Sequence, residues 1–194
     1  MKSEADDLRP SRFADVLQNG SEPRAIWDTS ILETDEFVVV PTLGSIVPNW
    51  LLLLPRMSAI NYREHERRCA TRAIDHLRSV VAEFGESDFT WFEHGAAEPA
   101  SATGCGVDYA HIHLLLDAPF SYEAIASHSI LKSNVEWRPS QFEAAYSNIR
   151  QDSDYYVLGN AESCIVHDSG VSLGSQFFRK SVADLDGVPE LAKP

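Results

Sequence analysis

Cysteine is scarce in this sequence of 194 residues. The three cysteines, Cys69, Cys105 and Cys164, are far apart and form no C-x-x-C pair. This spacing excludes a zinc ribbon and argues against a disulfide framework. We therefore expect a protein of a reducing compartment, the cytoplasm.

Long hydrophobic runs are missing as well. The longest, from Trp50 to Leu54, has five residues, whereas a membrane-spanning helix needs about 20. The first ten residues, MKSEADDLRP, are polar and acidic and lack the apolar region of a signal peptide. We expect no association with a membrane.

The sequence also contains few basic residues. The chain carries 16 Lys and Arg against 29 Asp and Glu, a net charge of -13, and has no block of basic residues. Such a surface repels a nucleic-acid backbone. A nucleic-acid polymer is therefore excluded as the expected partner, whereas a small phosphorylated ligand can be held by a few well-aimed donors.

The remaining composition is that of an ordinary globular protein. Hydrophobic residues make up 44% of the chain and charged residues 23%, which excludes a collagen, a coiled coil or wholesale disorder. The length suits one domain. We predict a polar N-terminal arm over residues 1–24 and a single domain over 25–194.

One long helix stands out in the pattern of apolar residues. Between Ala70 and Phe84 they recur at spacings of three and four, with Arg67, Arg68 and Arg72 on the opposite face. Gly85 follows where a left-handed helix cap belongs. The spacing predicts a helix over 70–84.

Strand patterns lie on both sides of that helix. Alternating or continuous apolar runs predict strands over 31–34, 37–40, 50–55, 89–94, 107–116, 155–158 and 164–167. Further helices are predicted over 139–149 and from about residue 175 onward. Because the strands come in hairpins and do not alternate singly with helices, we predict an α+β fold with a mostly antiparallel meander sheet.

The segment with the clearest chemistry runs from Gly104 to Leu116. Side chains alternate faces along a strand, so Tyr109, His111 and His113 share one face. Ala110, Ile112, Leu114 and Leu116 point the other way, into a core. A glycine-rich turn with backbone N–H groups suited to an anion precedes this polar row.

Three interpretations of the histidine pair compete. The two residues can be structural histidines on a half-exposed strand. They can hold a metal with a third ligand, for which the candidates are His94, Asp108, Glu93 and Cys105. They can act at a phosphorus centre, where a neutral imidazole is a good nucleophile that accepts a nucleotidyl group and passes it on.

At this point the sequence resembles a known family. Tyr109-Ala-His111-Ile-His113-Leu-Leu is similar to the signature of the histidine triad (HIT) superfamily, His-φ-His-φ-His-φ-φ with φ apolar. Residues 47–55 resemble the family's proline, strand, proline segment, and 92–95 and 104–107 fall where it has Asn-x-Gly and Gly-Gln-Ser-Val. The similarity covers a core of 37–119. In the extension, 120–194, Gln176-Phe-Phe-Arg179 resembles a Gln-φ-φ-Arg motif of a larger bacterial branch.

The resemblance implies a HIT-like fold, with one long helix packed on the sheet and a C-terminal helical extension. It implies a nucleotide hydrolase or nucleotidyltransferase that acts at the α-phosphorus of a dinucleoside polyphosphate or nucleoside phosphoramidate. His111 takes the position of the family nucleophile, His113 that of the phosphate contact, and Tyr109 a supporting position. The implied substrate-binding residues are Thr42, Glu93, His94, Cys105, Gly106, Val107, Gln176 and Arg179.

The resemblance also implies the molecules that accompany the site. No resident metal or cofactor is required, and Mg²⁺ arrives only with the nucleotide. The partners are a small nucleotide conjugate and a second copy of the chain in a homodimer.

Several positions depart from the family pattern. Tyr109 replaces the first histidine, Cys105 and Gly106 replace the Gln-Ser pair, Glu93 replaces the asparagine and Thr42 replaces a ribose-binding acid. These departures keep two alternatives open: a nucleotide-binding module with reduced catalysis, and a metal-dependent enzyme that uses the His-x-His pair.

Overall fold

The computed structural model describes residues 13–17, 26–69, 72–85, 89–101, 103, 107–170, 172–174 and 176–192. Its strands are β1 (Leu32–Glu33), β2 (Phe37–Pro41), β3 (Trp50–Pro55), β4 (Phe89–Gly95), β5 (Ile112–Leu116), β6 (Arg138–Gln141), β7 (Tyr155–Gly159) and β8 (Ser163–His167). Its α-helices are α1 (Ala14–Leu17), α2 (Tyr62–Arg68), α3 (Ala73–Phe84), α4 (Tyr122–Ser133) and α5 (Phe177–Leu185). Short 3-10 turns lie at Ile26–Asp28, Phe142–Ala144 and Pro189–Ala192.

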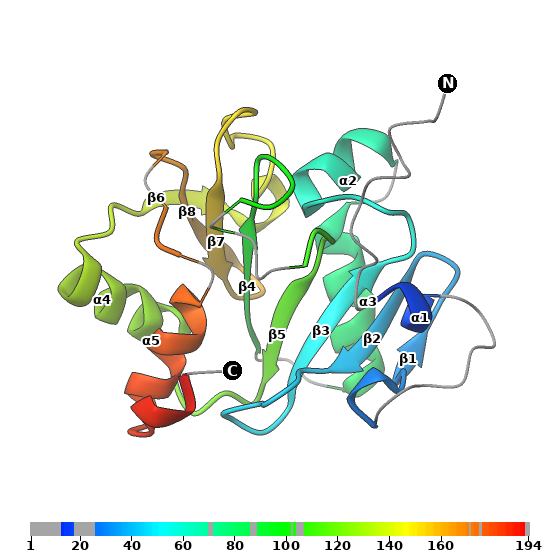
Figure 1. Ribbon diagram of the computed structural model, residues 1–194, viewed down its shortest axis with the longest axis horizontal. Helices are drawn as coiled ribbons and strands as arrows, with labels where there is room; N and C mark the ends of the chain where they lie inside the picture. Colours follow the sequence, from blue (N-terminus) through cyan, green and yellow to red (C-terminus); the bar gives the residue numbers. More distant parts are fainter. Residues whose placement is uncertain are drawn as a thin grey trace.

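The strands form one sheet in the order β1-β2-β3-β5-β4-β7-β8-β6 (Figure 1). Each neighbouring pair is antiparallel. The prediction of an α+β fold with an antiparallel sheet is therefore confirmed. The sheet is not a simple meander, because β5 is inserted between β3 and β4.

Two apolar layers cover the two faces of the sheet. On one face, alternate strand residues pack under α3, which contributes Ile74, Leu77 and Val80. On the other face, α5 packs over β4 and β7 through Phe177, Phe178 and Val182, and α4 lies beside α5. Figure 1 shows α4 and α5 together at one end of the sheet. Near the other end, Val16 and Leu17 of α1 pack against an apolar cluster from β2 and β3.

The alternation predicted for the histidine segment is confirmed. Ala110, Ile112, Leu114 and Leu116 lie in the core under α3. Leu115 lies in the core on the opposite face. Local strand geometry therefore sets the face on which His111 and His113 stand.

The helix predicted over 70–84 begins at Ala73 in the structure, as α3, and Arg72 before it is extended, with φ −90° and ψ 153°. A separate helix, α2, precedes it, and Cys69 at the end of α2 is also extended, with φ −114° and ψ 152°. The Glu66 side chain accepts a hydrogen bond from the Ala73 N–H at 2.9 Å, at the start of α3. Arg67 and Arg68 therefore belong to α2, whereas the predicted left-handed cap at Gly85, with φ 71°, is confirmed. Ala70 lies outside the described residues.

Other predicted elements need correction. The strand predicted over 107–116 begins only at Ile112. The helix predicted over 139–149 is a strand, β6, followed by a 3-10 turn, because the backbone of 138–141 pairs with β8. Helix α4 was not predicted. The C-terminal extension is thus not simply helical, since it adds β6, β7 and β8 to the same sheet.

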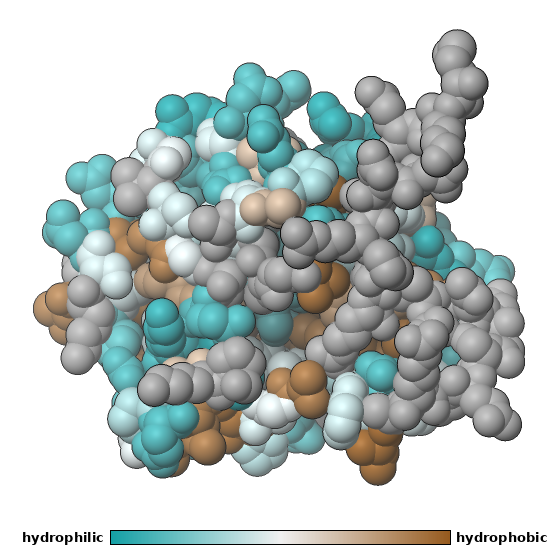
Figure 2. All heavy atoms as spheres, in the orientation of Figure 1, coloured by the Kyte–Doolittle hydropathy of each residue, from teal (hydrophilic) through white to brown (hydrophobic). Residues whose placement is uncertain are grey.

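The face of the molecule in Figure 2 is mostly hydrophilic where it is coloured, with hydrophobic residues in separate small groups. Ile26, Leu131 and Leu191 are among the exposed large hydrophobic side chains. No helix within the described part of the chain is long and apolar enough to cross a membrane.

Candidate active site

A cavity of about 600 Å³ opens on the sheet face that carries the histidines. Its floor is formed by β3, β4 and β5, and its walls by α5, the loop after β2 and Phe13. The lining residues are Phe13, Thr42, Leu43, Gly44, Ser45, Trp50, Leu52, Phe92, His94, Val107, His111, His113, Gln176, Phe178, Arg179 and Leu191. Among the lining residues that the structure describes, Arg179 is the one charged side chain.

His111 stands just before β5, where the Ala110 N–H donates to the Ala59 carbonyl at 2.7 Å. Its imidazole is buried, with 7% exposed. The ring Nδ1 lies 2.8 Å from the Tyr109 carbonyl oxygen. A carbonyl only accepts, so Nδ1 carries the proton and the lone pair of the neutral ring is on Nε2.

His113 is held by two aromatic residues. The Trp50 Nε1–H donates to His113 Nδ1 at 3.0 Å. Phe92 stacks on the imidazole, with ring centroids 4.7 Å apart and an interplanar angle of 18°. Burial, aided by His111, His94 and Arg179 nearby, holds the pKa of His113 well below its usual value. The ring is therefore neutral, and because Nδ1 accepts a hydrogen bond, the proton is on Nε2.

His94 has the same tautomer as His111. Its Nδ1 lies 2.8 Å from the Thr103 carbonyl oxygen, so Nδ1 donates and the lone pair is on Nε2. Burial lowers the pKa of His94, and the bond to Thr103 opposes the shift only in part. Asp154 accepts hydrogen bonds from the Thr103 hydroxyl at 2.6 Å and from Ser101 at 2.8 Å. Asp154 thereby positions the loop that orients His94.

The three imidazoles face one another. One ring nitrogen from each of His94, His111 and His113 lies within 4.8 Å of the others. His94 stacks on His113 with centroids 5.8 Å apart, and His111 meets both rings edge-on. Of the candidates for a third metal ligand that the sequence offers, His94 lies beside His111 and His113. Asp108 is not part of this group, and its carboxylate accepts a hydrogen bond from the Ala100 N–H at 2.8 Å.

Arg179 closes the cavity from α5. Its guanidinium donates to the carbonyls of Gly44 at 2.6 Å and Leu191 at 3.0 Å. A Cβ added at Gly44, where φ is +64°, would lie 3.2 Å from Arg179 Nη2. Glycine therefore allows this loop both its left-handed turn and the close approach of the guanidinium.

Of the other substrate-binding residues predicted from the sequence, some line the cavity and some are not described. Thr42, Val107 and Gln176 line the cavity. Thr42 is 9% exposed, and its hydroxyl has no hydrogen-bond partner among the described residues. Cys105 and Gly106 lie outside the described residues.

Glu93 does not line the cavity, which corrects its predicted role. It lies on β4 between Phe92 and His94, which do line the cavity, and so points to the other face of the sheet. Its carboxylate accepts from the Tyr62 N–H and the Tyr155 hydroxyl, each at 2.8 Å. Glu93 therefore joins α2 to the sheet.

Tyr109 also lies outside the lining of the cavity. Its hydroxyl donates to the Pro55 carbonyl at 2.7 Å. The side chain therefore braces the end of β3, while its backbone carbonyl orients His111. Tyr109 therefore acts on the site only through His111, as a positioning residue.

Sequence reasoning missed the residues that set the tautomers. The pattern around Trp50 predicts only a strand, and Thr103 and Asp154 belong to no motif. Their roles depend on contacts across 63 residues for Trp50 and His113, and across 51 residues for Thr103 and Asp154. Nothing in the local pattern around these residues indicates such contacts.

Comparison with known proteins gives limited information. No protein-family model matches the chain, and no curated protein matches it. Among solved structures, the chain is similar to yeast Ap4A phosphorylase Apa2 in complex with AMP, with a TM-score of 0.47 and 13% identity over 92% of this chain and 78% of that chain. For Apa2 in complex with Ap4A the values are 0.44 and 11% over 86% and 74%. Similarity at this level carries no argument about function.

Proposed function

We propose that the chain is a HIT-like enzyme, a nucleotide hydrolase or nucleotidyltransferase that acts at the α-phosphorus of a nucleoside phosphate conjugate. The observation that carries the proposal is the bond between His111 Nδ1 and the Tyr109 carbonyl at 2.8 Å. It keeps a nucleophilic lone pair on Nε2 at the wall of a cavity of about 600 Å³.

In the first step, the His111 Nε2 lone pair attacks the α-phosphorus. A P–N bond forms, the bond from phosphorus to the leaving group breaks, and the leaving group departs with that electron pair. The His113 Nε2–H donates a hydrogen bond to a phosphate oxygen, where charge gathers in the transition state. Trp50 keeps that donor in place, because its own N–H occupies His113 Nδ1.

In the second step, water or another acceptor takes the nucleotidyl group. The acceptor oxygen attacks phosphorus, and the P–N bond to His111 breaks and restores its lone pair. The proton of the acceptor passes to Nε2 of His94, whose Nδ1–H is held by the Thr103 carbonyl. His94 is thus a general base in this step and not a donor to the leaving group.

The cavity also suits a phosphorylated nucleoside. Arg179 supplies positive charge, and no carboxylate is among the lining residues of the described chain. The Thr42 hydroxyl has no protein partner among those residues and is suited to a ribose or base. Trp50, Phe92 and Phe178 offer apolar surface. A small anion of this kind is bound without repulsion, although the whole chain has a net charge of -13.

The proposal is tested by intact-protein mass spectrometry. The full chain is mixed with dinucleoside polyphosphates and nucleoside phosphoramidates and quenched early, in parallel with His111→Ala. A matched control is His167→Ala, since His167 is also buried and its Nδ1 also bonds a carbonyl, that of Glu136 at 3.0 Å. We expect a mass gain of one nucleotidyl group in the wild type and in His167→Ala but not in His111→Ala.

The other results identify the alternatives. Nucleotide affinity without adduct or turnover would replace the proposal by a nucleotide-binding module. Turnover that survives His111→Ala would exclude His111 as the nucleophile, because loss of a nucleophile lowers the rate by orders of magnitude.

A metal-dependent enzyme is the second candidate, favoured by the three histidine nitrogens within 4.8 Å of one another. Three imidazoles and an open position are a common catalytic zinc set. The bond from Trp50 opposes this candidate, because a His113 ring that accepts at Nδ1 has its proton on Nε2 and no lone pair there for a metal. Elemental analysis of protein purified without added metal separates the two: near-stoichiometric zinc would favour the metal enzyme.

A further inference from the structure

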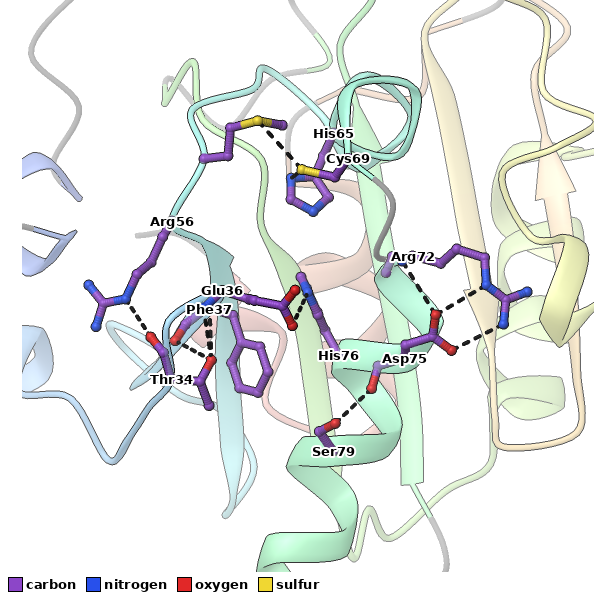
Figure 3. A network of polar contacts seen from close by, with 12 residues as sticks. Thr34, Glu36, Phe37, Arg56, His65, Cys69, Arg72, Asp75, His76 and Ser79 are labelled. Atoms are coloured by element: carbon purple, nitrogen blue, oxygen red, sulfur yellow. Dashed lines mark hydrogen bonds and ion pairs between the residues drawn. The ribbon is translucent and has the colours of Figure 1, made fainter.

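A second group of metal-binding side chains lies away from the cavity, around the gap between α2 and α3. It contains Met57, from the turn after β3, His65, from α2, and Cys69, which ends that helix. Figure 3 shows Cys69 directly over the His65 ring, with His76 below it. His65 and His76 approach from helices that cover the sheet face opposite the active-site cavity.

Cys69 lies at the spacing of a fellow ligand from each of the other two donors. Its Sγ is 3.5 Å from Met57 Sδ and 3.9 Å from His65 Nδ1. Metal–sulfur bonds of about 2.3 Å and metal–nitrogen bonds of about 2.0 Å, at angles of roughly 110–120°, place neighbouring donors about 3.6–4.0 Å apart. Cys69 is thus close enough to both Met57 and His65 to share an ion with either of them.

The surrounding histidines lack the partners that buried polar groups normally have. His65 is 2% exposed and His76 is 1% exposed. His65 Nε2 and both ring nitrogens of His76 have no hydrogen-bond partner among the described residues. His65 Nδ1 faces the thiol, at 3.9 Å. The group is therefore polar although it lies in an apolar layer, and the His65 nitrogen that faces the thiol, Nδ1, is the one placed to bind an ion beside it.

The chemistry of the donors selects the ion. A thiolate and a thioether together favour a soft monovalent ion such as Cu(I), because zinc sites are built from thiolate, imidazole and carboxylate and do not use thioether sulfur. Behind the group, His76 Nε2 lies 3.8 Å from a carboxylate oxygen of Glu36. This pair, also seen in Figure 3, offers an outer layer of polar groups.

We propose that Met57, His65 and Cys69 form a binding site for a soft monovalent metal ion, Cu(I), separate from the active-site cavity. Met57 contributes its thioether, His65 its Nδ1 lone pair and Cys69 a thiolate, whose proton passes to water on binding. No electron is transferred, because the ion enters as Cu(I). The site does not depend on the proposed nucleotide chemistry.

The test is an anaerobic titration in which the full chain competes with a chromophoric chelator for Cu(I) alone. We expect the wild type to remove one equivalent of the ion. Met57→Leu nearly keeps the volume of the side chain but removes the thioether, and it should weaken Cu(I) binding about 10-fold or more. Cys69→Ser removes the thiolate and should weaken binding further. Met57→Leu keeps the test decisive if Cys69→Ser does not fold.

Matched controls distinguish this site from other donors. Cys164→Ser and Cys105→Ser remove the other thiols, and His94→Ala removes one imidazole of the active-site group. All three should bind Cu(I) like the wild type. The proposal is overturned if the wild type takes up no Cu(I), if Met57→Leu and Cys69→Ser both keep wild-type affinity, or if only a control variant loses it.

Discussion

Replacing Trp50 by phenylalanine tests the central electrostatic feature of the active site. The substitution keeps an aromatic ring but removes the N–H that donates to His113 Nδ1 at 3.0 Å. In Trp50→Phe, His113 Nδ1 has no partner in either tautomer, so the preference for a proton on Nε2 is lost. When the proton moves to Nδ1, the Nε2 lone pair turns toward His94 and His111.

The size of the effect follows from the lost hydrogen bond. In the wild type, a proton on Nδ1 would face the Trp50 N–H and leave a buried donor without a partner, at a cost of about 1–3 kcal/mol that the substitution abolishes. The tautomer that donates from Nε2 therefore becomes less populated by a factor of roughly 5 to 150. We expect kcat/KM to fall about 10- to 100-fold, mostly through kcat, because the donor acts on charge that develops in the transition state. The same change creates a third lone pair, so the affinity for Zn²⁺ should rise.

The assay combines kinetics with nitrogen-15 NMR of the imidazoles, which distinguishes the two tautomers directly. Trp91→Phe is the matched control, since Trp91 is also fully buried and its Nε1–H donates to the Asn160 carbonyl at 3.1 Å, on the other face of the sheet. It should lose stability while kcat/KM and the His113 tautomer stay unchanged. If Trp50→Phe keeps both the Nε2–H tautomer and wild-type kcat/KM, Trp50 does not set the protonation of His113.

Further predictions concern the residues around the site. Burial raises the pKa of Glu93 from 4.5 to about 7, so the folded state keeps a proton that the unfolded chain loses, and stability falls as pH rises from 4.5 to 7. The free energy of unfolding of Glu93→Gln, relative to that of the wild type, should therefore rise by about 3 kcal/mol from pH 4 to pH 8 in denaturant unfolding. An equal difference at both pH values would refute this. Gly95→Ala should lose about 3 kcal/mol or more, because the new Cβ would lie 2.1 Å from Tyr155 Cζ; an unchanged Tm would contradict that packing. Tyr109→Phe should lose about 1 kcal/mol of stability, because its hydrogen bond to Pro55 is lost. Its kcat/KM should stay within a few-fold of the wild-type value, and a loss of orders of magnitude would show that the hydroxyl takes part in catalysis.

Much of the sheet could be predicted because its signals are local. The runs at 37–40, 50–55 and 89–94 are apolar, and the structure places strands there, buried on both faces except at Pro41. The failures occurred where a local pattern suited one element and a distant contact favoured another. Phe142, Ala145, Tyr146 and Ile149 have helical spacing, yet the adjoining backbone pairs with β8.

The later start of α3 has the same kind of cause. The apolar spacing reaches back to Ala70, so periodicity alone predicts a helix from that residue. The extended backbone at Cys69 ends α2, and the Glu66 carboxylate accepts from the N–H of Ala73 as α3 begins. Such side-chain caps are not visible in hydrophobic periodicity.

The sequence by itself determined that His111 and His113 share a face with Ile112 and Leu114 opposite, because alternation is a property of any extended chain. Only the tertiary structure decided which atoms of those histidines react. Strand order brought His94 beside the pair, and Glu93, its neighbour on β4, therefore faces the other side of the sheet. The proton positions depend on hydrogen bonds from residues distant in sequence, such as Trp50, and these exist only once the sheet has formed.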